Sequence, residues 1–166
     1  MNTVAQLIHA FQLQPHPEGG YYRQTYASDE RLSAASLPQR FGADRYMSTA
    51  IYFLLEGKDY SAFHRIKSDE LWHFYAGGGL NIYVIHPNGR GEILLLGNDL
   101  ENGYRFQHVV KAGCWFASKP ADENSYSLVG CTVSPGFDFA DFEMAKEDEL
   151  LQQYPQHSNW ISQLCR

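Results

Sequence analysis

Residues 57–77, GKDYSAFHRIKSDELWHFYAG, decide the fold because they contain two short apolar strands joined by a polar turn. The first predicted strand, residues 60–66, carries His64, and the second, residues 70–75, begins with Glu70. Side chains alternate between the two faces of a strand, so a tight turn can bring His64 and Glu70 into one apolar interior. A buried imidazole and a buried carboxylate cost free energy unless they pair, bind a ligand or shift pKa. We therefore take these two residues as the start of the candidate site.

Short apolar strands separated by turns continue on both sides of this stretch. Asn88 and Gly89 lie between two apolar runs, which is the strongest short-range signal of a β-hairpin. Residues 47–55 show little alternation, which predicts a strand that is covered on both faces. The remaining predicted strands are residues 21–26, 80–86, 92–96, 104–110, 114–118 and 126–134. This many short strands at regular spacing predict an all-β sandwich or barrel.

Helical patterns occur only at the two ends of the chain. Apolar residues at helical spacing predict an N-terminal helix that begins after a cap at Asn2 or Thr3 and ends near Leu13. Residues 146–153 and 158–164 predict a C-terminal helical tail.

The length of 166 residues fits one domain with a real core. We predict a single domain over residues 1–166, with the core at about residues 15–143 and the helical tail at about residues 145–164. Residues 29–44 are polar, small and contain a proline, so we expect a surface loop there.

Composition disfavours several classes of function. The net charge of −6 argues against a general nucleic-acid binder and against a protein that binds anionic membranes. The N-terminus is too polar for a signal peptide, and no apolar run approaches the roughly 18 residues of a membrane span. Cys114, Cys131 and Cys165 lack the spacing of a metal finger and are expected to be reduced and inert. We expect a cytoplasmic protein.

The central stretch resembles the first sequence motif of the cupins. That motif has two histidines, then a glutamate, then six residues and a glycine; here His64, Glu70 and Gly77 fit, and Ile66 stands at the second histidine. Phe116 stands where the second cupin motif has its ligand histidine. Five further blocks, in order, look like the DUF985 branch of the cupins, also called Cupin-5, over residues 15–143: HPEGGYYRQTY, SDELWHFYAG, LGNDL, VVKAGCWFA and GCTVSPGFDFADFE.

This resemblance implies a double-stranded β-helix jelly roll, with an N-terminal helix and a C-terminal helical tail. It also implies a homodimer that pairs through edge strands. Members are similar in shape to the RmlC-like epimerases of the dTDP-rhamnose pathway, which use a metal-free histidine base and a tyrosine acid. By this resemblance His64 is the expected base, Glu70 its partner and Tyr126 the expected acid. The alternative is a buried His64–Glu70 hydrogen bond that only stiffens the mouth of the barrel.

Substrate-binding groups are expected around this pair. Arg23 follows the HPEGG turn and would hold a phosphate or carboxylate, with Tyr21 on the same face of its strand. Glu18 is either a second carboxylate of the pocket or the ion-pair partner of Arg23. Gln107 is a candidate hydrogen-bonding group. The expected apolar walls are Phe63, Trp72, Phe74 and Phe116.

A bound catalytic metal usually needs about three protein ligands, and His64 and Glu70 supply two. We therefore expect no metal cofactor, with a weakly held divalent ion at these two residues as the alternative. The expected ligand is a small molecule. Three functions stay open: a metal-independent isomerase or epimerase acting on a sugar-like or nucleotide-linked substrate, a non-catalytic metabolite-binding module, and a metal-dependent cupin with an incomplete ligand set. Whether the protein is an enzyme is left open by the sequence.

Overall fold

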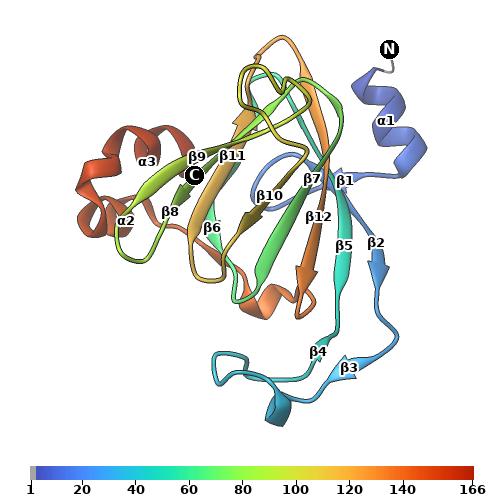
Figure 1. The fold of residues 1–166 in the computed structure, drawn as a ribbon, viewed down its shortest axis with the longest axis vertical. Coiled ribbons are helices and arrows are strands. Elements are labelled where there is room, and N and C mark those ends of the chain that lie inside the picture. Colours follow the sequence, from blue (N-terminus) through green and yellow to red (C-terminus); the bar gives the residue numbers. More distant parts are fainter. Residues whose placement is uncertain (1–2) are drawn as a thin grey trace.

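The computed structural model describes residues 3–166, which form two antiparallel sheets that face each other (Figure 1). The larger sheet has six strands, in the order β1 (Gln14–Pro15), β2 (Tyr21–Ala27), β5 (Thr49–Glu56), β12 (Tyr126–Ser134), β7 (Asp69–Gly77) and β10 (Gln107–Val110). The smaller sheet has five, in the order β13 (Glu143–Met144), β6 (Ser61–Arg65), β11 (Trp115–Pro120), β8 (Leu80–Ile85) and β9 (Gly91–Leu96). The predicted all-β jelly roll is confirmed.

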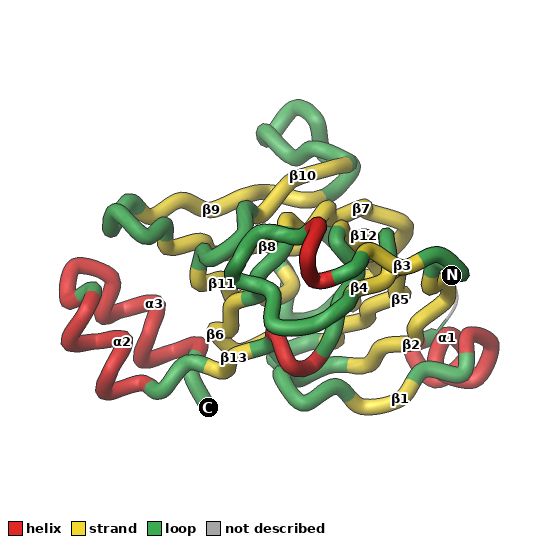
Figure 2. The backbone as a smooth tube through the Cα atoms, turned by 90° about the horizontal axis from the view of Figure 1, so that it is seen from below, coloured by secondary structure: helices red, strands yellow, loops and turns green. Residues whose placement is uncertain are grey.

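Helices cover the outside of the sandwich at opposite ends (Figure 2). Helix α1 (Val4–Phe11) begins at Thr3, whose side chain and backbone exchange hydrogen bonds with Gln6 in a capping box. The helix ends before the predicted Leu13 because Gln12 adopts a left-handed conformation. The alternative cap Asn2 lies outside the described residues. Helices α2 (Glu147–Gln153) and α3 (Ser158–Leu164) form the predicted tail. The 3-10 helices are η1 (Ala34–Ser36), η2 (Phe139–Asp141) and η3 (Pro155–His157).

Strand alternation distributes the apolar residues among three clusters. Phe53 and Leu55 of β5 point into the core between the sheets, whereas Leu54 points outward and packs beneath α1. This agrees with the prediction that residues 47–55 form a strand covered on both faces. In β6, Phe63 packs against α2 and α3, so His64 points the other way, toward the interior. The alternation of β6 therefore places an imidazole between the two sheets.

Two features of the connections bear on the predictions. The Asn88–Gly89 turn joins β8 to β9, as expected, and Gly89 has a positive φ of 85°. The predicted loop at residues 29–44 is more ordered than expected, because β3 (Arg31–Leu32) pairs with β4 (Arg45–Tyr46). Within residues 3–166, no helix has the length and apolar character needed to cross a membrane.

Candidate functional site

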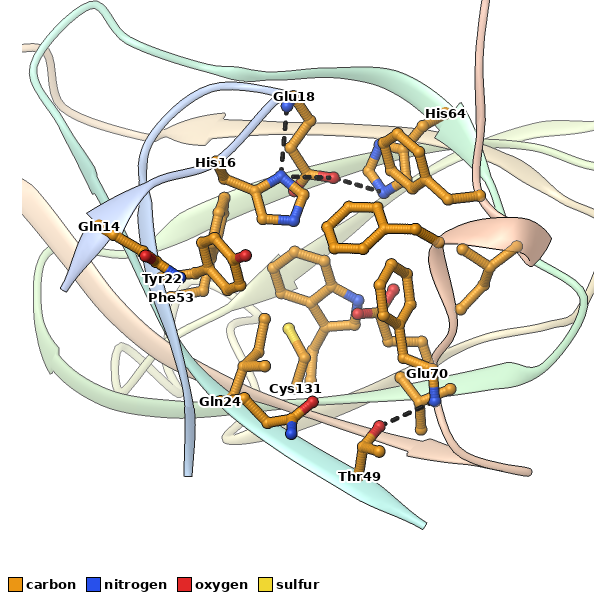
Figure 3. Close-up of a pocket in the computed structure, with 17 residues that line it drawn as sticks. Gln14, His16, Glu18, Tyr22, Gln24, Thr49, Phe53, His64, Glu70 and Cys131 are labelled. Atoms are coloured by element: carbon orange, nitrogen blue, oxygen red, sulfur yellow. Dashed lines mark hydrogen bonds and ion pairs between the residues drawn. The ribbon is translucent and has the colours of Figure 1, made fainter. Parts of the chain in front are cut away.

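A cavity of about 210 Å³ lies between the two sheets (Figure 3). Most of its wall is apolar or aromatic, and its polar groups are few, which is typical of sites for small ligands. The side chains that line it are Gln14, His16, Glu18, Tyr22, Gln24, Thr49, Ile51, Phe53, His64, Ile66, Glu70, Trp72, Cys131, Val133, Phe137, Phe139 and Phe142.

The main polar feature of the cavity is a contact between His64 and Glu18. The Nε2 atom of His64 lies 3.0 Å from Oε2 of Glu18, and both side chains are more than 90% buried. On the other side of the imidazole, Nδ1 lies 2.7 Å from the carbonyl oxygen of Ala62. A carbonyl oxygen can only accept, so Nδ1 carries a proton and donates it to Ala62.

This geometry decides where the next proton lies. With Nδ1 protonated, a neutral His64 has a bare Nε2, so the proton between Nε2 and Glu18 belongs to the carboxyl group. Burial lowers the pKa of His64 to about 3. Burial and the neighbouring Glu70 raise the pKa of Glu18 well above its ordinary value. Both shifts favour the uncharged pair, in which the Glu18 carboxyl donates to His64.

Glu18 reaches this position from a tight turn at residues 16–20. The carbonyl oxygen of Glu18 accepts a hydrogen bond from the backbone of Ala62, and the Gly20 backbone donates to Asp59. Gly19 has a φ of 112°, and a Cβ there would collide with the carbonyl oxygen of Tyr60. Only glycine fits this close approach, which explains the Gly19–Gly20 pair.

His16, at the start of the same turn, is a second buried imidazole in the cavity. Its Nδ1 accepts a hydrogen bond of 3.2 Å from the backbone N–H of Glu18, so Nε2 is the protonated nitrogen. Burial lowers the pKa of His16 to about 4. His16 therefore contributes a neutral N–H donor to the wall near Glu18.

Glu70 enters the cavity from the opposite sheet, on β7. Its carboxyl group accepts a hydrogen bond from the thiol of Cys131, while burial raises its pKa to about 7. The cavity contains no arginine or lysine among its lining residues, so no cation offsets the cost of ionising Glu70. A substantial fraction of Glu70 is therefore protonated near neutral pH.

Aromatic side chains from residues 137–142 close one side of the cavity. The Phe142 ring centroid lies 5.2 Å from that of His64 and 6.0 Å, edge to face, from that of His16. The Phe139 ring stacks on His16 with its centroid 6.1 Å away. This segment is held by Asp141, whose carboxylate accepts two hydrogen bonds of 2.7 Å from the buried Arg45. The ion pair fixes the aromatic cover at the edge of the site.

The structure brings together four of the predicted site residues: His64, Glu70, Glu18 and Trp72. The partner of His64 is Glu18, however, and the predicted His64–Glu70 pairing is wrong. The reason is that β6 and β7 belong to different sheets, so their side chains face each other across the cavity. Of the two alternatives for Glu18, the second pocket carboxylate is correct.

Two further predicted wall residues lie in the core next to the cavity. The Phe116 ring centroid is 4.1 Å from that of His64, so Phe116 supports the imidazole. Phe74 is partly buried against the same core cluster.

Five predicted site residues lie outside the cavity. Arg23 donates to the Phe11 carbonyl and to Gln12, and so caps the end of α1. Tyr22 and Gln24 line the cavity in place of Tyr21 and Arg23, because a one-residue error in phase exchanges the two faces of a strand. The predictions for Arg23 and Tyr21 are thus wrong, and so are those for three other residues. Gln107 contacts His73, Tyr126 packs beneath α1, and Phe63 packs beneath α2 and α3.

Sequence reasoning missed several lining residues. His16 is the most important of them, and its place two residues before Glu18 in the HPEGG turn was the available signal. Gln24 and Thr49 follow from the correct phase of β2 and from its pairing with β5, and Gln14 from the pairing of β1 with β2, which no local pattern specifies. Cys131 was predicted to be an inert buried thiol, and burial does raise its pKa well above the ordinary value.

The residues present do not fit the metal site of the cupin motifs. Ile66 and Phe116 occupy two of the expected ligand positions, and both are buried in the apolar core. Within residues 3–166 no group of three or more His, Cys, Asp or Glu side chains is arranged to hold a metal ion.

The sequence of this chain matches a known protein family. Residues 5–145 match Cupin_5, described as Cupin superfamily (DUF985). The chain is 32% identical over 160 residues to the uncharacterised protein YML079W of Saccharomyces cerevisiae, covering 90% of this chain and 79% of the yeast protein.

Solved structures show the same similarity. Protein SO0799 from Shewanella oneidensis is 42% identical, with a TM-score of 0.89 over 100% of this chain and 99% of that one. A hypothetical protein from Leishmania major is 37% identical, with a TM-score of 0.89 over 99% of each chain. Oxalate decarboxylase is 15% identical, with a TM-score of 0.54 over 90% of this chain and 36% of the other, and shares the fold alone.

Proposed function

The chain belongs to the Cupin_5 (DUF985) family of the cupin superfamily, and from its buried acid–base pair we propose that it is a small-molecule isomerase or epimerase. The observation that carries this proposal is the 3.0 Å contact between His64 Nε2 and Glu18 Oε2 inside a partly enclosed, largely apolar cavity. A positioned acid–base pair in such a place contributes typically 10²- to 10⁴-fold to a proton transfer.

The pair can take up and return one proton. The second carboxyl oxygen of Glu18 accepts the substrate C–H proton while the carboxyl passes its own proton to His64 Nε2, which leaves an imidazolium at His64 beside a neutral Glu18 carboxyl. The electron pair of the broken C–H bond stays on the substrate, where an adjacent carbonyl group holds it as an enolate. Return of the proton to the opposite face of the same carbon gives an epimer. If a proton first moves from the hydroxyl oxygen to the enolate oxygen, return of the C–H proton to the neighbouring carbon gives an isomer. Ala62 keeps the imidazole oriented throughout.

The cavity limits the size and charge of the substrate. Its volume of about 210 Å³ is smaller than the roughly 300–1,000 Å³ of drug-sized pockets. With Arg23 outside and no other cation on the wall, nothing in the cavity would hold a phosphate or carboxylate. We therefore favour a small, uncharged, sugar-like substrate over one in which a nucleotide is itself buried in the cavity.

The test is incorporation of solvent deuterium into a panel of small sugars. The protein is incubated in deuterated water with dihydroxyacetone, glyceraldehyde and erythrulose, and exchange at carbon is followed by NMR. We expect exchange with the wild-type protein and its loss in His64→Gln. Arg23→Ala is the matched control because Arg23 lies outside the cavity. Binding of these sugars without any exchange above the His64→Gln background would favour the metabolite-binding alternative.

We also propose that two copies pair through the outer face of β7 and β10. Leu71 and Val109 lie directly opposite each other there and are exposed, as are Tyr75 and Phe106. Strand β10 ends the larger sheet, and an exposed apolar edge strand is a natural pairing surface.

A further inference from the structure

Trp72 carries a buried hydrogen-bond donor that the protein itself does not use. Its side chain is fully enclosed, with a relative exposure of 1%, and it lines the cavity. Its indole N–H has no hydrogen-bond partner among the described residues. Leaving a buried donor unpaired costs roughly 1–3 kcal/mol, so such a group needs a reason.

A second indole shows that burial alone does not make a site. Trp115 also has an unpaired, buried N–H, but it packs in the cluster beneath α2 and α3, away from the cavity. The guanidinium of Arg65 covers its ring at 4.4 Å. Trp72 differs because its surroundings include an enclosed space that a ligand can fill.

Glu70 and Trp72 are two residues apart on β7 and both line the cavity. The Glu70 carboxyl has no cationic partner in the cavity wall, and the Cys131 thiol donates to it. The proposed acid–base pair, His64 and Glu18, comes from β6 and from the turn at residues 16–20, so it lies on the other side of the cavity. A substrate between the sheets would therefore meet the His64–Glu18 pair on one side and the side chains of Glu70 and Trp72 on the other.

We infer that the Trp72 indole N–H and the Glu70 carboxyl bind the carbonyl oxygen of the substrate, which makes the substrate class small, uncharged α-hydroxycarbonyl compounds. This inference deepens the proposed function and rests on it. Trp72 and Glu70 favour a carbonyl group because its oxygen has two lone pairs and no proton of its own, so it accepts from both donors at once and gains negative charge as the enol forms, whereas an alcohol oxygen brings a further O–H. A site with buried donors discriminates strongly against ligands that cannot pair them.

The proposed step balances as a keto–enol conversion. The C–H bond next to the carbonyl breaks, its proton goes to the Glu18–His64 pair, and its electrons form a C=C bond. The carbonyl π electrons move to the oxygen, which accepts a hydrogen bond from Trp72 and the proton of Glu70. The products are an enediol, an imidazolium at His64 and a carboxylate at Glu70, and both protons return in the second half of the reaction.

The indole N–H of Trp72 can be observed directly. The chain has three tryptophans, so ¹⁵N-labelled protein gives three indole signals, which Trp72→Phe, Trp115→Phe and Trp160→Phe assign. The probes are dihydroxyacetone and glycerol, which share a carbon skeleton and differ in the carbonyl group. We expect dihydroxyacetone to shift the Trp72 signal and slow its exchange with solvent, while glycerol, which lacks the carbonyl oxygen, produces a clearly smaller change. The Trp115 signal should not respond to either probe.

A Trp72 signal that stays fixed with dihydroxyacetone, or that moves equally with glycerol, overturns the inference. This result is distinct from failure of the proposed function: a Trp72 shift without deuterium exchange refutes only the proton transfer, and exchange without a shift refutes only the role of Trp72. As a second test, Trp72→Phe should slow deuterium exchange about 10²- to 10³-fold, as loss of one donor to a developing oxyanion does. Trp115→Phe, which removes an equally buried N–H outside the cavity, should leave the exchange rate unchanged.

Discussion

Arg45 and Asp141 face each other in the interior, and two guanidinium nitrogens each lie 2.7 Å from a carboxylate oxygen. The two residues are 96 positions apart in the chain, and both are almost fully buried. Their pairing joins β4 to η2 and so connects the small β3–β4 hairpin to the aromatic cover of the cavity. This long-range contact gives the first prediction.

Asp141→Asn should destabilise the protein by about 3–5 kcal/mol, because it leaves the Arg45 charge buried without its partner. The free energy of unfolding from urea titrations measures the effect. Glu143→Gln is the matched control, since it breaks the exposed Arg65–Glu143 pair and should cost no more than about 1 kcal/mol. Equal effects of the two substitutions would contradict the structural role of the Arg45–Asp141 pair.

Glu18→Gln should separate activity from stability. A glutamine amide can still donate to His64 Nε2 in the same geometry, so we expect the free energy of unfolding to change by no more than about 1 kcal/mol. The amide cannot exchange a proton with the imidazole, so deuterium incorporation into sugars should fall by about 10²- to 10⁴-fold. Full exchange activity in this variant would remove Glu18 from the proposed acid–base pair.

Glu70→Gln should change how stability depends on pH. The pKa of Glu70 is raised from 4.5 to about 7, so the folded protein holds this proton more tightly than the unfolded chain. The stability that Glu70 contributes is therefore present at low pH and is lost as the pH rises from about 4.5 to about 7. Between these limits the stability of Glu70→Gln relative to wild type should rise by about 3 kcal/mol. Unfolding curves at about pH 4.5 and about pH 8 measure this change. An equal difference in the free energy of unfolding between the two proteins at both pH values would show that Glu70 is not desolvated.

Val109→Lys tests the proposed pairing of two copies. It places a charge opposite Leu71 at the centre of the outer β7–β10 face and should shift the protein to a monomer. Light scattering after size-exclusion chromatography measures the mass. Thr25→Lys, an exposed change on β2 at the far side of the same sheet, should leave the mass unchanged. A wild-type monomer, or a dimer that persists in Val109→Lys, would refute this surface.

The strands, the turns and the family could be predicted from the sequence because they depend on local signals. Alternation and the Asn88–Gly89 turn located β6 to β9, and the sequence blocks identified the jelly roll. The site was predicted less well because it depends on which strands face each other. His64 and Glu70 both line the cavity, but they come from different sheets, and the imidazole pairs with Glu18 from the turn at residues 16–20.

The errors at Arg23 and Tyr21 have a simple physical origin. Strand β2 is second from the edge of the larger sheet, next to the two-residue β1, and is polar on both faces, with the sequence Tyr-Tyr-Arg-Gln-Thr-Tyr. The hydrophobic pattern therefore does not define which face is inside, and the phase is set by pairing with β5. Tyr126 was misplaced for a similar reason, because α1 covers the outer face of β12 and makes that face apolar too.

The peptide backbone of Ala62 touches both members of the acid–base pair: its N–H donates to the Glu18 carbonyl, and its carbonyl oxygen accepts from His64 Nδ1. Every residue except proline carries the backbone N–H, and every residue carries the carbonyl oxygen, so replacing neighbouring side chains does not remove these two hydrogen-bonding groups. Other residues of the cavity lining can therefore be replaced, which would change the ligand that fits, without removing the main-chain contacts that hold His64 and Glu18. Under the proposed function, ligand preference and proton transfer would thus depend on separate parts of the chain.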